Sequence, residues 1–128
     1  MISSKKDSEE RHQRFVRQAL DTQFVWGLQC AEGWCQAPSN HVEDARVMPF
    51  WSDRGLAAEC AIEEWSEYSP TPVSLADFRD KWLPSMKTSM KTNRFLVGTN
   101  WTPQLIGVEL APELLEQEFV RGSGEEVE

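Results

Sequence analysis

The chain has 128 residues, a length typical of one domain that buries its core without disulfides or metals. It carries 13 Lys and Arg against 21 Asp and Glu, a formal net charge of −8 with a pI near 4.8, which argues against nonspecific binding to nucleic acid or to an anionic membrane. A mean hydropathy of −0.52 and the lack of an apolar run of about 18 residues exclude a transmembrane helix, and the polar N-terminus does not resemble a secretory signal, so we expect a cytoplasmic protein.

Two segments near the N-terminus show the spacing of regular structure. Apolar residues within residues 8–22 recur three and four positions apart, which predicts an amphipathic helix with His12 at the edge of its buried face. Residues 24–30 alternate instead, which predicts a strand. The side chains predicted to face the core from this strand are those of Phe24, Trp26, Leu28 and Cys30.

Glu32 and Gly33 predict a two-residue turn after this strand, because glycine adopts a positive φ at low cost. The resulting register places Cys30 opposite Cys35 and turns Trp34 to the other face of the hairpin. The chain has three cysteines, and an odd number in a domain of this size indicates free thiols in a reducing compartment.

The centre of the chain is an apolar strand over residues 47–51 that leads directly into a helix. Pro49 lacks a ladder donor, so we expect this strand at a sheet edge or beside a bulge. Ser52 supplies an N-cap oxygen, and apolar residues at helical spacing continue the helix to Trp65. The outer side of this helix is predicted to carry one row of carboxylates, those of Glu59, Glu63 and Glu67.

The next stretch predicts a connector, a helix and a loop. The prolines in residues 69–72 indicate a rigid connector along a sheet edge. Ser74 then supplies the cap of a helix that Pro84 ends or kinks. Residues 85–93 hold two Met-Lys-Thr triplets and indicate a mobile, locally basic loop.

The last elements complete the fold class. Alternation over residues 95–101 and a return through residues 105–110 predict a second hairpin, and Pro112 suits the first turn of a final helix. The order of elements predicts an α+β fold, with about five strands in an antiparallel or mixed sheet packed with four helices. We expect one α+β domain over residues 1–121 and an acidic disordered tail over residues 122–128.

A set of short motifs resembles the bacterial family known as domain of unknown function 2750. The motifs are Val25-Trp26-Gly27-Leu28, Glu32-Gly33-Trp34, Pro38-Ser39-Asn40, Pro49-Phe50-Trp51-Ser52, Glu64-Trp65, Trp82-Leu83-Pro84 and Val97-Gly98-Thr99-Asn100-Trp101. They span roughly two-thirds of the chain and are specific in combination. The resemblance implies a single small α+β domain from a bacterium, and it brings no activity and no catalytic residues.

Cys30, Cys35 and His41, with Cys60, are the candidate metal or thiol ligands. Their spacing lacks a Cys-x-x-Cys pair, so the match to a structural zinc site is weak, and we expect no metal and no cofactor. Buried cysteines usually behave as small inert hydrophobes.

The polar loop of residues 38–44 is the candidate for catalysis or ligand binding, because loops held by a rigid sheet often carry sites. It holds Ser39, Asn40 and His41 close together, but triad partners normally meet through the fold and no Gly-x-Ser-x-Gly elbow is present. A turn that satisfies its own backbone is the simpler interpretation. An enzymatic role stays open and is less favoured than a noncatalytic one.

Six tryptophans and six phenylalanines against one tyrosine form a strong aromatic bias. Most of these rings occupy positions that the predicted helices and strands turn toward the core, but Trp34 is predicted to lie on the opposite face of its strand. Trp51 and Trp101 fall at strand ends, where an indole pairs an apolar body with a polar partner. With Asn40 and Asn100 they are candidates for a groove that binds a peptide or a small ligand.

Together these patterns favour a noncatalytic cytoplasmic interaction domain with an acidic, tryptophan-bearing binding face. Glu59 and Glu63 on that face favour a basic protein partner. The alternative is a small enzyme or small-ligand-binding protein that uses residues 38–44. A third hypothesis is a homodimer paired through an exposed edge strand. We expect neither nucleic acid nor a membrane among the partners.

Overall fold

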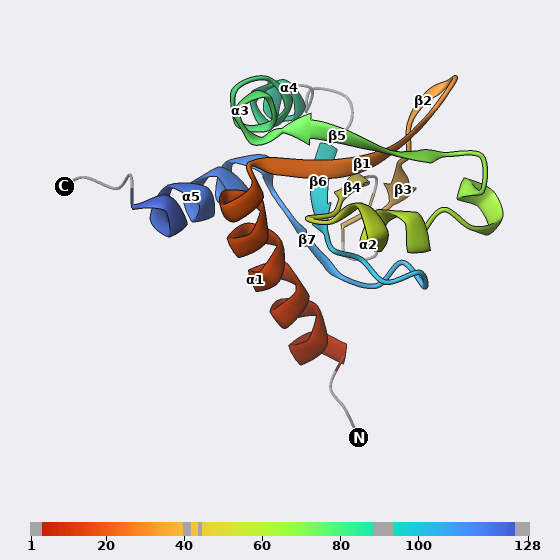
Figure 1. Cartoon of the computed structure of the whole chain (residues 1–128), viewed down its shortest axis with the longest axis horizontal. Helices are drawn as coiled ribbons and strands as arrows, with labels where there is room; N and C mark the ends of the chain where they lie inside the picture. The colour runs from red at the N-terminus through yellow and green to blue at the C-terminus, as the bar shows by residue number, and fades with distance from the viewer. Residues whose placement is uncertain (1–3, 40–41, 44, 89–93, 125–128) are drawn as a thin grey trace.

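The computed structural model describes residues 4–39, 42–43, 45–88 and 94–124. Their strands form two sheets (Figure 1). The first is antiparallel, in the order β2-β1-β5. Its strands are β1 (Phe24–Cys30), β2 (Gly33–Trp34) and β5 (Ser69–Ser74). The second is mixed, in the order β3-β4-β6-β7. Its strands are β3 (Ala37–Pro38), β4 (Ala45–Phe50), β6 (Arg94–Thr99) and β7 (Val108–Leu110).

Four helices in the described part of the chain pack around these sheets, so the α+β class is confirmed, with two sheets in place of the single sheet predicted. The first, second and last helices are α1 (Ser4–Thr22), α2 (Arg54–Glu59) and α5 (Pro112–Ser123). The third is continuous and consists of α3 (Leu75–Asp77), the π-helical η2 (Phe78–Trp82) and α4 (Leu83–Thr88). A short 3-10 turn, η1 (Glu63–Trp65), follows α2.

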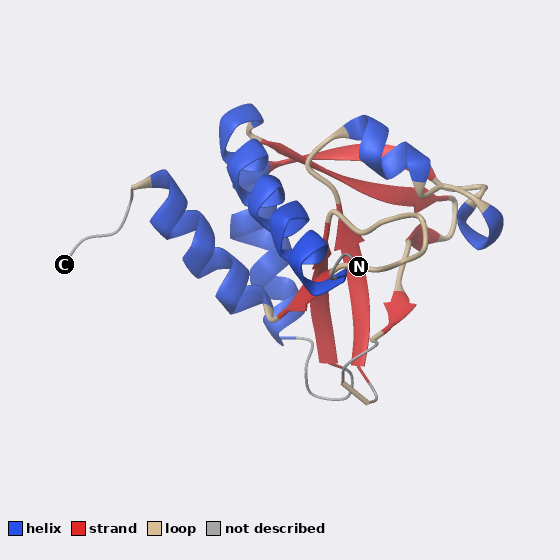
Figure 2. Ribbon diagram, turned by 90° about the horizontal axis from the view of Figure 1, so that it is seen from below, coloured by secondary structure: helices blue, strands red, loops and turns tan. Residues whose placement is uncertain are grey.

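The strands separate two hydrophobic clusters, because both β1 and β4 are buried on two faces. One cluster holds Phe15 of α1, Phe50 of β4 and Phe119 of α5, and the other holds Leu28 of β1 and Trp51. Figure 2 shows α1, α5 and the α3–α4 helix gathered on one side of the sheets, with α2 on another. The helix side therefore builds the first cluster, and α2 with the loops builds the second.

Trp26 and Trp51 join the two sheets. Each backbone N–H donates to the carbonyl of the other residue at 2.7 Å, in an isolated antiparallel bridge. The end of β4 is therefore tied both to β1 and, through its ladder, to β6.

Two strand predictions are corrected by the structure. Phe24 is exposed and Val25 is buried, the reverse of the prediction, because alternation does not distinguish the faces of a strand that is covered on both sides. β4 is an inner strand and not an edge. Its pairing with β3 ends at Val47, so Pro49 has a paired strand on one side only and its missing N–H leaves the ladder to β3 intact.

The first hairpin turns earlier than predicted. Cys30 pairs with Gly33 and Gln29 with Trp34, so the turn is Ala31-Glu32 and Gly33 has a φ of +134°. Cys30 therefore does not lie opposite Cys35. The faces are unchanged, since the register slips by an even number of residues.

The helices also differ from their predicted ends. Asp53, not Ser52, caps α2, and α2 ends at Glu59, so the predicted helical row of Glu59, Glu63 and Glu67 does not form. Ser74 does cap α3, through a hydrogen bond of 3.1 Å from the Asp77 N–H. The helix continues past Pro84 after a π turn in which the Leu83 N–H reaches the Phe78 carbonyl.

Three further segments differ from their predicted form, and two of them are only partly described. The prolines of residues 69–72 lie in β5, which is an edge strand as expected and not a connector. The predicted basic loop begins with α4, which runs to Thr88, and residues 89–93 lie outside the described part of the chain. Helix α5 includes the first two residues of the predicted tail, Gly124 caps it in the left-handed region, and residues 125–128 are not described.

Candidate functional site

Two of the tryptophans proposed for a groove are core residues. Trp51 is 0% exposed and Trp101 is 2% exposed. The Trp51 Nε1–H donates to the Trp101 carbonyl at 3.1 Å, and the Trp101 Nε1–H donates to the Val108 carbonyl at 3.0 Å. The expectation that these indoles line a surface groove is therefore wrong, since their polar ends pair with backbone inside the protein.

Asn100 is the centre of a buried hydrogen-bond network rather than part of a surface. Its backbone is left-handed, with a φ of +48°, and its side chain is fully buried. The side-chain carbonyl accepts the Ser52 N–H at 2.8 Å, and the amide donates to the Ser52 hydroxyl at 3.0 Å and to the Arg11 carbonyl at 3.2 Å. The Ser52 hydroxyl in turn donates to the Gln18 side chain at 2.7 Å. The network ties α1, the end of β4 and the end of β6 together.

Trp34 is half-buried and packs into the first core. Its ring meets Trp82 edge to face, with centroids 4.7 Å apart, and also contacts Phe50. A side chain at Gly27 would overlap this ring, because a Cβ there would lie 2.8 Å from it. Trp34 therefore fills the space that a glycine in the neighbouring strand leaves open.

Ser39 holds a turn. Its hydroxyl donates to a Glu109 carboxylate oxygen at 2.5 Å and accepts the Val42 N–H at 2.9 Å. This pattern matches the turn interpretation of the loop. The other residues predicted for that loop, Asn40 and His41, lie outside the described part of the chain.

The three cysteines are free thiols. Burial raises the pKa of Cys35 to about 12 and the pKa of Cys60 to about 11. The pKa of the Tyr68 hydroxyl is also raised, first by a hydrogen bond to Cys30 and then by burial. Raised thiol pKa values disfavour the nucleophilic thiolate. Among the described residues there is no group of three His, Cys, Asp or Glu side chains placed to hold a metal ion.

An acidic cleft lies between η1 and the loop that joins β6 to β7. It has a volume of about 200 Å³. The residues that line it are Cys60, Ile62, Glu63, Glu64, Trp65, Pro103, Gln104 and Leu105. Two of these residues have left-handed backbones, Glu63 with a φ of +52° and Leu105 with a φ of +65°. Such conformations are costly for residues with a side chain and recur at binding sites. We call this region the acidic cleft below.

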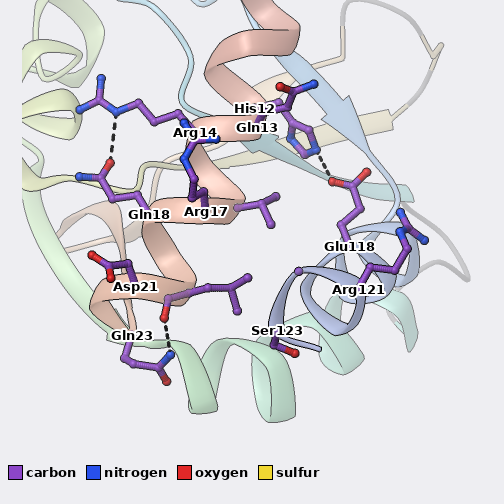
Figure 3. Close-up of a pocket in the computed structure, with 13 residues that line it drawn as sticks. His12, Gln13, Arg14, Arg17, Gln18, Asp21, Gln23, Glu118, Arg121 and Ser123 are labelled. Atoms are coloured by element: carbon purple, nitrogen blue, oxygen red, sulfur yellow. Dashed lines mark hydrogen bonds and ion pairs between the residues drawn. The ribbon is translucent and has the colours of Figure 1, made fainter. Parts of the chain in front are cut away.

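A second and larger hollow is the open groove between α1 and α5, with a volume of about 1360 Å³ (Figure 3). His12 lies at one end, where its Nε2 is 2.5 Å from Glu118 Oε1 and its Nδ1 is 2.8 Å from Thr99 Oγ1. We call this region the α1–α5 groove.

The hydrogen-bonded side chains of Thr99, His12 and Glu118 supply the hydroxyl, imidazole and carboxylate of a catalytic relay, but the hydroxyl is not accessible to a substrate. Thr99 is fully buried, so its hydroxyl cannot reach a substrate. His12 instead links α1 to β6 and to α5. The sequence placed His12 correctly at the edge of its helix, but it gave no signal for the two partners, which lie 87 and 106 residues away.

No helix in the described residues has the length and apolar character needed to cross a membrane.

Comparison with known proteins gives one match. No curated protein and no solved structure matches the chain. The family model described as a protein of unknown function, DUF2750, matches residues 12–119, which include both cores, the acidic cleft and most of the α1–α5 groove. The chain therefore belongs to the DUF2750 family.

Proposed function

We propose that this protein is a noncatalytic interaction domain that binds a basic segment of a protein partner at the acidic cleft. The observation that carries the proposal is the exposure of apolar side chains there. Ile62 is 45% exposed and Ile106, which follows the cleft residue Leu105, is 46% exposed. Only two other large hydrophobic side chains of the described residues are comparably exposed. Exposed apolar residues with a polar rim are typical of docking surfaces.

The charge around these isoleucines favours a basic partner. Glu63 and Glu64 line the cleft and are exposed, and Glu59 and Glu67 are exposed just before and after it in the chain. Each such carboxylate contributes little alone, but a field of one sign steers an oppositely charged partner and disfavours acidic ones. Glu59 and Glu63 thus keep a role in the proposal, although not as a helical row.

The size of the cleft favours one anchoring side chain over a small metabolite. Its volume of about 200 Å³ is below the roughly 300 to 1000 Å³ of typical small-molecule sites. Trp65, which is mostly buried, forms part of its wall. The exposed carboxylates of Glu63 and Glu64 at this cleft suit a Lys or Arg side chain, which gains an ion pair there.

We favour a protein partner over the two other hypotheses. Residues 38–44 provide a hydroxyl at Ser39 that already holds a turn. Among the described strands, a homodimer paired through a sheet edge would have to use β2 or β3, which have two residues each, the three-residue β7, or β5, which carries Pro70 and Pro72. Proline lacks the donor that strand pairing requires.

The test is capture of partners from a lysate of the source cells by three baits. The first is the unmodified chain, the second carries Glu59→Gln, Glu63→Gln and Glu64→Gln, and the third carries Glu9→Gln and Glu10→Gln, which change exposed carboxylates on α1. We expect a stoichiometric, salt-sensitive protein whose capture falls about tenfold with the second bait and not with the third. Equal capture by all three baits would contradict the proposal, as would background alone from a folded bait.

A further inference from the structure

The α1–α5 groove differs from the acidic cleft in the sign of its charge. Three arginines line it, Arg14 and Arg17 on α1 and Arg121 on α5. Two acids also line it, Asp21 and Glu118. Glu118 is engaged by His12 at one end. In a chain with a formal net charge of −8, this groove is a local exception.

Two of the arginines are available to a ligand. Arg17 and Arg121 are exposed, and in the part of the chain that the structure describes neither guanidinium forms an ion pair with a carboxylate. Elsewhere Arg79 pairs with Glu116 at 2.7 Å. An unpaired guanidinium has a planar set of donors that matches a carboxylate in two-point geometry.

The floor between these arginines is apolar. Val16 and Leu20 of α1 are partly buried there. Gly122 of α5 allows the two helices to approach, because a Cβ at that position would lie 2.7 Å from the Leu20 Cδ1. Figure 3 shows His12 of α1 and Glu118 of α5 facing each other at one end of the groove, and Ser123 of α5 at the other end.

The dimensions indicate a peptide rather than a metabolite. The volume of about 1360 Å³ exceeds the roughly 300 to 1000 Å³ of small-molecule sites, and the groove is open along its length. A peptide in a groove between helices gains affinity from apolar anchors on the floor and selectivity from charges on the walls.

We infer that the α1–α5 groove docks an acidic, partly apolar peptide segment of a second protein, with its carboxylates on Arg17 and Arg121 and its apolar side chains on Val16 and Leu20. This inference does not depend on the acidic cleft. The two sites use different residues and select partners of opposite charge.

The test is a fluorescence anisotropy titration with a labelled synthetic peptide of alternating Glu and Leu, at several salt concentrations. A matched Lys and Leu peptide is the control probe. We expect the acidic peptide to bind more tightly than the basic one at this groove, and its affinity to fall as salt screens the charges.

A charge-reversed chain locates the site. Arg17→Glu with Arg121→Glu should weaken binding of the acidic peptide by about tenfold or more, while Arg54→Glu on α2, an exposed arginine outside the groove, should change it by less than about twofold. Both arginines are exposed, so we expect the variant to fold, and its circular dichroism spectrum checks this. No binding of the acidic peptide, or equal binding by both variants, would overturn the inference.

A chain that ends at Gly124 distinguishes another occupant. In the sequence, Gly124 is followed by Glu-Glu-Val-Glu at residues 125–128, which has the same chemistry as the proposed ligand. If the peptide binds the shortened chain and not the full one, the groove belongs to the chain's own C-terminal residues, and docking of a second protein is overturned. Equal binding by both chains supports the inference.

Discussion

The Asn100 network and the acidic cleft both contain non-glycine residues with a left-handed backbone, but these residues differ in burial and in side-chain hydrogen bonding. Asn100 is fully buried, and its side chain bonds to Ser52 and to the Arg11 backbone. Glu63 is exposed, and its side chain forms no hydrogen bond or ion pair within the described residues. In the first region side-chain hydrogen bonds of the left-handed residue offset its unfavourable backbone, whereas the turn at Glu63 is held by backbone hydrogen bonds, such as that from the Ser66 N–H to the Glu63 carbonyl at 3.1 Å.

This difference separates residues that hold the fold from residues that are available for binding. A strained backbone persists only when its surroundings determine it. At Asn100 the surroundings are three segments that meet in the core, so the residue is required for stability. At Glu63 no neighbouring group in the described residues binds the carboxylate, so the residue with the unfavourable backbone presents an exposed charge beside Ile62.

The largest expected effect comes from Asn100→Ala. This change keeps the unfavourable φ but removes the side-chain partners of the Ser52 N–H and the Arg11 carbonyl, so we expect the free energy of unfolding to fall by roughly 2 to 4 kcal/mol in urea denaturation. Asn100→Gly is the matched control. It loses the same hydrogen bonds but tolerates the φ, so it should lose less than the alanine variant. A loss below about 0.5 kcal/mol for alanine would remove the distinction between the two regions.

Gly98→Ala tests the packing that holds the same buried region together. A Cβ at Gly98 would lie 2.6 Å from the Trp101 ring, which is buried and fixed by its bond to Val108. The ring has little room to yield, so we expect a loss of about 1 to 3 kcal/mol by thermal or urea unfolding. Gly55→Ala in the exposed part of α2 is the control and should change stability by less than about 1 kcal/mol. Equal effects at both glycines would argue against tight packing at Trp101.

Cys60 connects the two regions, since it lines the acidic cleft and its thiol donates to the Trp101 carbonyl at 3.5 Å. Its folded pKa of about 11 lies above the ordinary value of 9.0, mainly because of burial. A raised pKa means that the folded state retains the proton, so the stabilising contribution is complete below pH 9 and is lost as the pH rises toward 11. As the pH rises from 8 to 10, the free energy of unfolding of the Cys60→Ala variant should therefore fall by about 1 kcal/mol less than that of the unmodified chain. Parallel pH curves would show that Cys60 is not desolvated.

Local patterns predicted most of the secondary structure. Helical spacing located α1 and α5, alternation located β1 and β6, and the Ser74 cap fixed the start of α3. These features depend on neighbours within a few residues, which a single sequence displays. The two-sheet arrangement depends on the pairing of Trp26 with Trp51 across the fold, and no local pattern reports such a pair.

The candidate site was harder to predict, because a residue can bind a partner only if it lies on the surface, and burial depends on tertiary contacts. Trp51 and Asn100 fell at strand ends, where the sequence allows either a surface or a core position, and the bridge and the network place both in the core. The charge of Glu63 predicts a binding residue, and Glu63 lies next to the exposed Ile62 because helix α2 ends at Glu59. Helix ends of this kind depend on tertiary contacts as well as on propensity.

The smallest expected effect, and the sharpest comparison, is Glu63→Gly against Glu64→Gly in the same 3-10 turn. Glu63 has a φ of +52°, whereas Glu64 has an ordinary φ, so glycine relieves an unfavourable backbone only at the first position. We expect Glu63→Gly to leave stability unchanged or to raise it by up to about 1 kcal/mol, and Glu64→Gly to lower it by about 0.5 to 1 kcal/mol, both by urea unfolding. Both variants remove one exposed carboxylate, so the loss of charge cancels in the comparison. A loss at Glu63 as large as that at Glu64 would show that Glu63 has stabilising contacts, and the acidic cleft would then resemble the Asn100 network.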